Sequence, residues 1–375
     1  MKDFCILFTC VFLYVAISER VKAQSYPEHY TSKKTISIPI GLGVGKVSIE
    51  YLFLGKSARL PDAIAIDNSG EFIIGSRLQP QTIQNFDNDG RFVSVLATRG
   101  CDNGNVNYPS KLAVDSNNAI YVLDACRCIE PSFLTGGYSL KKFNSTGEFI
   151  YKVGHESVRL NPTEHDYVSQ LQVTPGGNVY FHDFYNSKNR KDAWGSPELE
   201  QGDFGVDASG SLVGAVTDCF YENYQGDVVK IEKKHTTQNT NYTITRYGGP
   251  EQTTKPKQFV ADEAQLNVNK INTFGIDSAY ESTFLGFDKS GDMYFDQSSV
   301  NQQNGMTQIK IPQNIVYKYS PQCELMTKIE FPKDIGGSRF VDSQGNVYLA
   351  HVVVATPKHF TEGDHIEIQK WVLLR

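Results

Sequence analysis

One short pattern recurs five times along this chain. In each copy an apolar segment ends at an Asp or Thr, a Gly or Asn follows three residues later, and a segment rich in aromatic residues comes next. The copies span Ala65–Ile74, Ala113–Val122, Gln172–Phe181, Gly286–Phe295 and Phe340–Leu349. Because an Asp or Thr side chain can bond the amides of a turn and Gly or Asn tolerates positive φ, each copy predicts a β-hairpin.

A second hairpin follows several of these copies, at Ile83–Leu96, Leu140–Val153 and Ile315–Ile329. Two hairpins make a four-stranded antiparallel unit, and a unit that recurs about every 50 residues is typical of a repeat architecture. Four-stranded units arranged radially are the blades of a β-propeller, which bury their faces against one another. We therefore expect an all-β fold, a six-bladed β-propeller that occupies residues 24–375 as a single domain.

The blade count depends on the least regular part of the pattern. Segment Phe204–Val213 could be the first or the second hairpin of a blade. As a second hairpin it completes the third blade, and Asp218–Val260 then becomes a degenerate fourth blade. Both assignments give six blades, while five or seven stay open. We interpret Thr236–Lys257, which is rich in Thr, Asn, Gln and Lys, as a surface insertion or a long hairpin.

The last repeat lacks one strand. Gly336–Arg375 contains three clear strand segments, whereas a blade needs four. The segment Lys34–Leu54, in which Ile and Val alternate with other residues, is expected to supply the missing strand and close the ring.

The N-terminus has the features of a secretory leader. An apolar run, Phe4–Ile17, follows Lys2, and Val21–Ala23 offers small residues for cleavage before Gln24. We expect residues 1–23 to be a signal peptide and the protein to be secreted and extracellular, with a retained membrane anchor as the alternative and no stable membrane insertion of the mature chain. The net charge of −6 argues against a nucleic-acid partner, because no basic stripe is available for phosphates.

Removal of the leader leaves an odd number of cysteines, namely Cys101, Cys126, Cys128, Cys219 and Cys323. In an oxidising compartment at least one thiol then stays free or pairs between chains. Cys101 precedes the second repeat while Cys126 and Cys128 follow its second strand, so a disulfide from Cys101 to one of them is expected. The spacing of Cys126 and Cys128 does not match a zinc knuckle, which needs two paired arms of ligands.

Two triplets match the acceptor pattern for N-glycosylation. They begin at Asn144 and Asn241. Asn144 falls in a predicted hairpin turn that should face solvent, which suits a glycan. We therefore expect a glycoprotein with these two asparagines as candidate sites.

Several acidic and histidine side chains are predicted to share one mouth of the ring. The second strand of each blade ends on the same face as the loops that enter the blades, so residues after the aromatic positions should converge there. This ligand-face rim comprises Asp124, His182, Asp183, Asp296 and His351, together with His165 and Asp166 on the loop that enters the third blade.

Two interpretations of this rim compete. An Asp at this position can simply bond the backbone amides of a loop, which would account for Asp124, Asp183 and Asp296 without any ligand. Alternatively, His165, His182 and His351 could hold a divalent metal, zinc or calcium, at the axial channel with the help of a carboxylate.

The repeats resemble NHL repeats. The resemblance rests on Tyr121–Asp124 followed by Phe143–Gly147, an aromatic strand that ends in Asp and then a second hairpin around Phe-Asn-x-x-Gly. It implies a ring-shaped propeller, and members of the family include both enzymes and binding modules. Similar secreted propellers include a zinc-dependent amidating lyase and calcium-dependent lactonases. Segment Gly41–Lys46 superficially resembles a phosphate-binding loop but lacks its spacing and its following Ser or Thr.

These observations lead to two functional hypotheses. The first is a secreted, non-catalytic propeller that binds a protein, peptide or glycan on its loop-bearing face. The second is a lactonase-like or amidating-lyase-like metal-dependent hydrolase or lyase, in which a metal at the axial channel activates water or polarises a carbonyl.

Overall fold

A computed structural model shows a chain whose described elements are all β-strands. The described residues are 28–52, 57–61, 63–76, 80, 82–100, 102–125, 138–154, 168–183, 203–206, 208–216, 220–235, 239–247, 268–277, 283–297, 314–332, 337–353 and 363–374. These residues hold no helix with the length and hydropathy that a bilayer crossing needs.

The first half of the chain contributes three four-stranded antiparallel sheets. The first sheet comprises β4 (Ile64–Ile66), β5 (Phe72–Gly75), β6 (Ile83–Phe86) and β7 (Phe92–Ala97). The second comprises β8 (Pro109–Val114), β9 (Ile120–Ala125), β10 (Tyr138–Phe143) and β11 (Phe149–Gly154). The third comprises β12 (Val168–Val173), β13 (Val179–Asp183), β14 (Asp203–Val206) and β15 (Leu212–Val216).

Three further four-stranded sheets complete the set. The fourth comprises β16 (Phe220–Glu222), β17 (Val228–His235), β18 (Asn239–Tyr247) and β19 (Val268–Asp277). The fifth comprises β20 (Thr283–Phe287), β21 (Met293–Gln297), β22 (Ile315–Tyr319) and β23 (Leu325–Glu330). The sixth comprises β24 (Ser338–Val341), β25 (Val347–Val353), β26 (His365–Leu374) and β1 (His29–Pro39). A small extra hairpin pairs β2 (Glu50–Leu52) with β3 (Ser57–Arg59).

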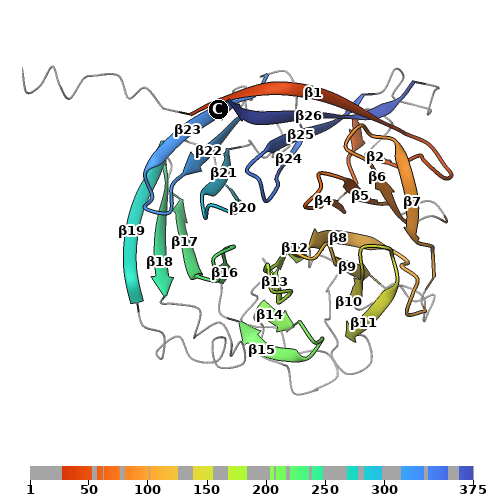
Figure 1. The fold of residues 1–375 in the computed structure, drawn as a ribbon, viewed down its shortest axis with the longest axis horizontal. Coiled ribbons are helices and arrows are strands. Elements are labelled where there is room, and N and C mark those ends of the chain that lie inside the picture. Colours follow the sequence, from red (N-terminus) through yellow and green to blue (C-terminus); the bar gives the residue numbers. More distant parts are fainter. Residues whose placement is uncertain are drawn as a thin grey trace, which may run out of the picture.

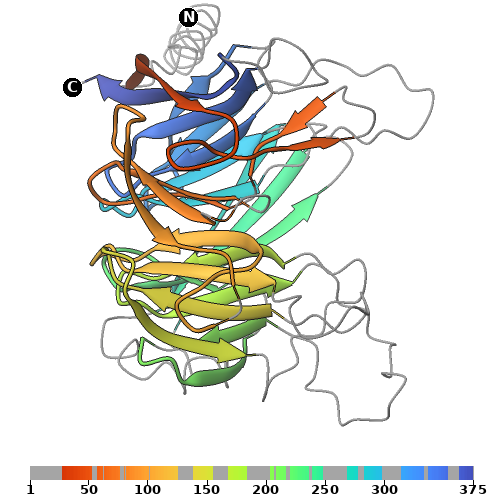
Figure 2. The ribbon, with the colours of Figure 1, turned by 90° about the vertical axis from the view of Figure 1, so that its right-hand side faces the viewer.

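The sheets stand around a common centre, with the first strand of each sheet innermost (Figure 1). Seen from the side, they form a short, thick ring (Figure 2). Apolar side chains fill the spaces between neighbouring sheets, and the cluster between the sixth and first sheets includes Tyr348, Ile366, Phe72 and Phe86. The predicted all-β propeller fold is confirmed.

The two ends of the chain meet in the sixth sheet. β1 runs antiparallel to β26, from His29 opposite Leu374 to Pro39 opposite His365. A strand from the N-terminal region therefore completes the last sheet, as the missing strand in the last repeat indicated. Its position differs from the predicted Lys34–Leu54, since the strand begins five residues earlier and ends at Pro39. The chain turns away there through the Gly41–Gly45 segment, whose glycines have positive φ.

Segment Phe204–Val213 lies in the second hairpin of the third sheet, where β14 pairs with β15. The region after it forms the fourth sheet, which extends to Asp277. Of the two interpretations of Thr236–Lys257, the surface insertion is wrong for the middle part and the long hairpin is confirmed there, because β18 pairs with β17 from His235 opposite Thr240 to Val228 opposite Tyr247. Tyr242 and Ile244 of this strand are buried while Asn241 is exposed, so its polar composition concealed a half-buried strand.

The hairpin turns have the predicted chemistry. In the first sheet Asp67 Oδ1 accepts hydrogen bonds from the amides of Ser69 and Glu71, both at 2.8 Å. Gly70 occupies the turn with a φ of 87°, a conformation that a side chain would disfavour. Asp115, Asp288 and Asp342 hold their turns in the same way. Each recurring Asp thus fixes a tight turn at the same face of the ring.

Candidate functional site

The face opposite these turns is the predicted loop-bearing mouth. Three residues of the predicted rim have described side chains there, namely Asp124 on β9, Asp296 on β21 and His351 on β25. His182 and Asp183 lie at the equivalent end of β13, where only the strand itself is described. His165 and Asp166 lie outside the described residues.

Asp124 holds a loop of this mouth in place. Its carboxylate, which is fully buried, accepts the amide of Asn107 at 3.1 Å and that of Tyr108 at 2.7 Å. Lys141 on β10, also fully buried, approaches the same carboxylate at 2.9 Å and donates to the carbonyls of Asp102 and Asn105. Asp124 and Lys141 therefore form a clamp on segment 102–108, which enters the second sheet.

Asp296 has a different role. Its carboxylate lies 3.5 Å from the guanidinium of Arg339, which belongs to β24 of the next sheet. Arg339 is buried, packs over the ring of Phe331 and donates to the carbonyl of Gly337. Nε and Nη2 of Arg339 find no hydrogen-bond partner among the described residues. The pair joins the fifth and sixth sheets beside the mouth.

Sequence spacing accounts for this difference. Asp124 and His351 each follow the Asp of their hairpin turn by nine residues, whereas Asp296 follows Asp288 by eight. Successive residues of a strand point to opposite faces of the sheet. The single predicted rim is therefore divided, because Asp296 and Asp124 point in opposite directions from equivalent strands.

His351 is a half-buried member of the rim. Its Nε2 lies 3.5 Å from Glu367 on the neighbouring strand β26, and its Nδ1 is buried without a hydrogen-bond partner among the described residues. Burial lowers the pKa of His351, although Glu367 opposes the shift. The ring is therefore held mainly in its neutral form, which can accept a proton or a metal at one nitrogen.

Other predicted site residues are only partly visible. No group of three or more metal-binding side chains occurs within the described residues, and the side chains of His165 and His182 lie outside them. Cys101, Cys126 and Cys128 also lie outside, and Cys323 is half-buried and forms no disulfide among the described residues. Asn144 lies in the predicted β10–β11 turn, and Asn241 is an exposed residue of β18.

The opposite mouth is lined by the hairpin turns, and a tyrosine supports several of them. Tyr121, six residues after Asp115, donates to Asp115 Oδ2 at 3.0 Å and reaches the carbonyl of Gly177 in the next sheet at 3.2 Å. Tyr294 and Tyr348 repeat the bond to their own turn aspartates. Burial raises the pKa of all three tyrosines, so they stay neutral donors. The Asp-to-Tyr spacing was available in the sequence as a signal for this network.

Hydrogen bonds also connect the turns of successive sheets. Between the fourth and fifth sheets, Gln225 donates to the Lys289 carbonyl, and between the fifth and sixth, the Lys289 amide donates to the Ser343 carbonyl.

The sixth, first and second sheets are connected in the same way. Between the sixth and first sheets, the Ser343 hydroxyl donates to the Asn68 side chain, and between the first and second, the Asn68 amide donates to the Asn118 side chain. Ser116 of the second sheet donates to the Pro175 carbonyl of the third. The recurring hairpins thus join the sheets as well as shaping each one.

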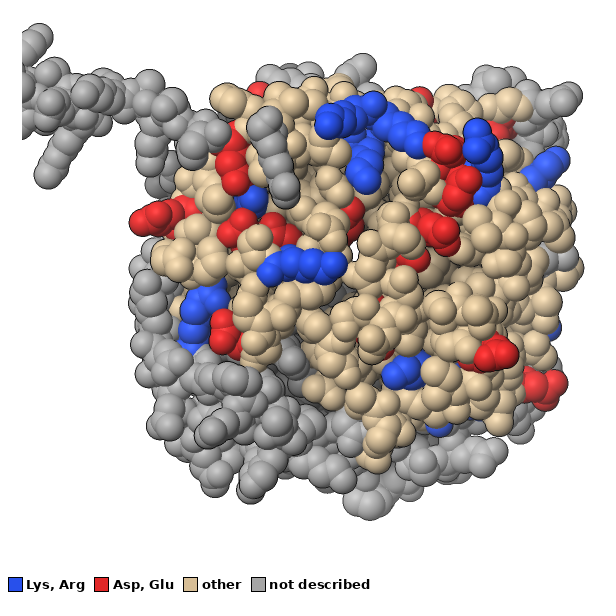
Figure 3. Space-filling view, in the orientation of Figure 1, with Lys and Arg blue, Asp and Glu red and all other residues tan. Residues whose placement is uncertain are grey.

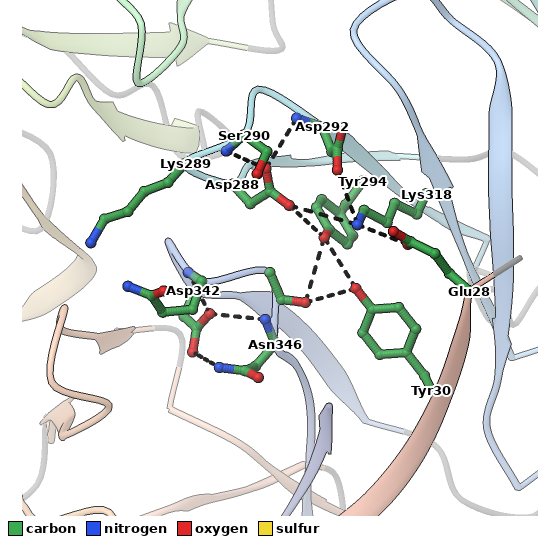
Figure 4. Close-up of polar contacts among 12 residues, drawn as sticks. Glu28, Tyr30, Asp288, Lys289, Ser290, Asp292, Tyr294, Lys318, Asp342 and Asn346 are labelled. Atoms are coloured by element: carbon green, nitrogen blue, oxygen red, sulfur yellow. Dashed lines mark hydrogen bonds and ion pairs between the residues drawn. The ribbon is translucent and has the colours of Figure 1, made fainter. Parts of the chain in front are cut away.

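A buried ionic cluster lies at the junction of the fifth and sixth sheets (Figure 4). Lys318 on β22 contacts Glu28 at 2.9 Å, Asp292 at 3.0 Å and Asp288 at 3.9 Å. Tyr30 on β1 donates to the Gly345 carbonyl at 2.9 Å and meets the Tyr294 hydroxyl at 3.2 Å. Glu28 thereby attaches the start of the N-terminal segment to β22 of the fifth sheet, and Tyr30 attaches it to a turn of the sixth sheet.

The ionisation of this cluster follows from its burial and its charges. Although burial favours the neutral amine, Tyr30, Glu28 and Asp292 raise the pKa of Lys318 above its ordinary value. Burial and the neighbouring Asp292 raise the pKa of Asp288, although Tyr294 and Lys318 oppose the shift. Sequence analysis missed Lys318 and Glu28, because their contacts join residues far apart in the chain.

The face seen in Figure 1 carries both signs of charge. Acidic and basic side chains are mixed across it, around a small central opening (Figure 3).

Comparisons with known proteins bear on the fold alone. A scan against protein-family models and a search of the curated proteins found no match. A crystal structure of a member of the DUF4221 family from Bacteroides vulgatus is similar, with a TM-score of 0.50 and 12% identity over 94% of this chain and 100% of that chain. A gluconolactonase from Xanthomonas campestris has a TM-score of 0.40 at 12% identity, over 92% of this chain and 99% of that one. The Dos1 propeller has a TM-score of 0.40 at 12% identity, over 88% and 82%. At 12% identity the first of these similarities bears on the fold and not on an activity, and no argument rests on the other two.

Proposed function

We propose that this protein is a secreted, NHL-like propeller of six blades that binds a protein, peptide or glycan on its loop-bearing face. The six four-stranded sheets would be the blades, and residues 1–23 would be removed as a signal peptide. Asn144 and Asn241 would carry glycans, and Cys101 would pair with Cys126 or Cys128. Nucleic acid is not among the proposed partners.

The observation that carries the proposal is the clamp of Asp124 and Lys141 on segment 102–108. The polar atoms of this buried ion pair bond the amides and carbonyls of the loop, and these bonds hold the loop in one conformation. A rigid scaffold that presents ordered loops is the usual basis of a binding surface. Asp296 is likewise engaged with Arg339, so two of the predicted rim carboxylates support structure.

The alternative is a metal-dependent hydrolase or lyase. It rests on His351, whose pKa is lowered by burial and whose Nδ1 has no partner among the described residues. His165 and His182 would be the further ligands of a zinc or calcium ion at the axial channel. The metal would activate water or polarise a carbonyl.

A binding screen with loop variants tests the first proposal. The mature protein is applied to glycan and peptide arrays, and each ligand found is titrated against Asp102→Ala and Asn103→Ala, two exposed positions on the clamped segment. Both variants should weaken binding, while Ser145→Ala on the exposed β10–β11 turn should leave it unchanged. Ligands whose affinity depends on Ser145 and not on the clamped segment would contradict the proposal.

Metal analysis separates the two functions. A scaffold that binds its ligand without metal should contain well below one equivalent of zinc or calcium after purification. One retained equivalent that disappears in both His182→Ala and His351→Ala would instead support the metal-dependent enzyme.

A further inference from the structure

The Gly41–Lys46 segment forms an ordered loop directly after β1. The amide of Gly41 donates to the Val47 carbonyl at 3.0 Å, and the amide of Val47 returns a bond to the Pro39 carbonyl at 2.9 Å. Gln84 of β6 fixes the far side, since its side chain accepts the Gly45 amide and donates to the Lys46 carbonyl, both at 2.7 Å. The loop is therefore attached to both the last and the first sheet.

This loop presents two large apolar side chains to solvent. Leu42 is 65% exposed and Val44 is 55% exposed. The loop packs beside the start of β7, because a Cβ on Gly45 would lie 3.3 Å from Cβ of Phe92. Phe92 and Val93 are themselves 38% and 48% exposed. We call Leu42, Val44 and Phe92 the apolar patch; they are three of the six exposed large hydrophobic side chains among the described residues, and Val93 points to the other face of β7.

Cationic side chains border the apolar patch. Lys46 is exposed at the end of the loop, and Arg91, with a side chain that is 79% exposed, precedes Phe92. Lys34 of β1 contacts Asp89 and the Asn88 carbonyl in the adjacent turn. Of the acidic residues in that turn, Asp87 bonds the backbone amides of Asp89 and Arg91. Three cations thus border the patch against two carboxylates, Asp87 and Asp89, and Asp89 also lies 3.5 Å from the guanidinium of Arg91.

We propose that the apolar patch is a reversible contact surface for an anionic lipid membrane. Leu42 and Val44 would enter the headgroup region, and Lys34, Lys46 and Arg91 would face the lipid phosphates. Apolar side chains on a prominence flanked by cations are the combination that favours interfacial binding to anionic bilayers. Three side chains are few for a stable interface between protein copies, which buries about 800 Å² on each partner.

Sedimentation with vesicles tests this proposal. Mature protein is mixed with vesicles of phosphatidylcholine alone or with 30% phosphatidylglycerol, at about 0.1 M salt, and the bound fraction is measured. Binding should occur with the anionic vesicles and weaken at higher salt. Lys46→Glu and Arg91→Glu should each lower the partition coefficient at least fivefold, since one basic residue near such a surface contributes about 1 kcal/mol.

The apolar part of the patch is tested with a matched control. Leu42→Ser with Val44→Ser should reduce binding at least tenfold, while Ile150→Ser, which changes a 50% exposed apolar side chain on β11, should not. Thermal melts verify that every variant is folded. Absence of binding to anionic vesicles, equal binding to neutral ones, or equal loss with Ile150→Ser would each overturn the proposal. So would a concentration-dependent dimer that the Leu42 and Val44 changes abolish, because the patch would then bind a second copy.

Discussion

The Tyr294 hydroxyl donates to Asp288 Oδ2 at 2.9 Å across a single hairpin, and it lies 3.5 Å from the Gly345 carbonyl of the next sheet. One side chain thus supports its own turn and touches its neighbour's. Tyr30 from the N-terminal strand completes the arrangement by bonding the same carbonyl. The buried hydroxyl of Tyr294 therefore takes part both in its own hairpin turn and in the contacts that close the ring.

Tyr294→Phe should lower the free energy of unfolding by about 2 kcal/mol, because a buried carboxylate loses a hydrogen-bond donor while the aromatic packing stays. Urea denaturation of the mature protein measures the change. The control is the same Tyr294→Phe change made in an Asp288→Ala background, in which the carboxylate that accepts this bond is already absent. An equal loss of stability in both backgrounds would show that the bond to Asp288 does not cause the effect.

Lys318→Met should cost about 3 kcal/mol or more. The side chain of Lys318 is only 5% exposed, so its removal leaves the carboxylates of Asp292 and Asp288 buried without their cation. Glu28→Gln should cost less, because Glu28 is 19% exposed and water can replace part of the contact. The two variants are compared by denaturant unfolding, and a larger loss for Glu28→Gln would contradict this assignment.

Cys323 occupies a position that suits glycine. Its φ is 65°, and the corresponding turns of the first three sheets have Gly90, Gly147 and Gly210. Cys323→Gly should therefore be more stable than Cys323→Ala by about 1 kcal/mol, since both remove the thiol and only glycine relieves the left-handed backbone. Thermal melts compare the melting temperatures of the two variants. A higher melting temperature for Cys323→Ala would show that the left-handed backbone at this position causes no strain.

The stability of the protein should fall as pH drops below the ordinary pKa of histidine. Burial lowers the pKa of His351, so the folded state favours the neutral ring and loses that advantage as the ring is protonated. Melting temperatures between pH 7.5 and 5 should decline less steeply in His351→Gln than in the parent protein. His29→Gln serves as control, since His29 is an exposed residue at the start of β1. Identical slopes in parent and His351→Gln would refute the prediction.

Much of the architecture was readable from the sequence because its determinants are local. The Asp and the Gly that shape each turn are three residues apart, and the paired strands follow within about ten residues. β18 was predicted only as part of one alternative, a long hairpin, because Thr- and Asn-rich segments form strands only where alternate residues are apolar, as Tyr242 and Ile244 are. The bounds of β1 were not predicted correctly, because its partner β26 lies at the other end of the chain.

The candidate site was predictable only in part. The sequence indicated which strand ends share a face, yet the shift of one residue between Asp124 and Asp296 changes the face to which each side chain points. No sequence pattern indicated that Lys141 would form an ion pair with Asp124 or that Arg339 would form one with Asp296. Those pairs depend on how strands and sheets pack, which no local pattern encodes.

By itself the sequence determined the hairpins, their turns and the propeller that they build, since each depends on hydrogen bonds and side-chain alternation within a short stretch. The tertiary structure alone decided that Glu28 meets Lys318, 290 residues away, and that Tyr30 meets Gly345, 315 residues away. It also decided that the Gly41–Lys46 loop would present Leu42 and Val44 to solvent. Closing the ring brings the two chain ends together, and only that closure creates these contacts.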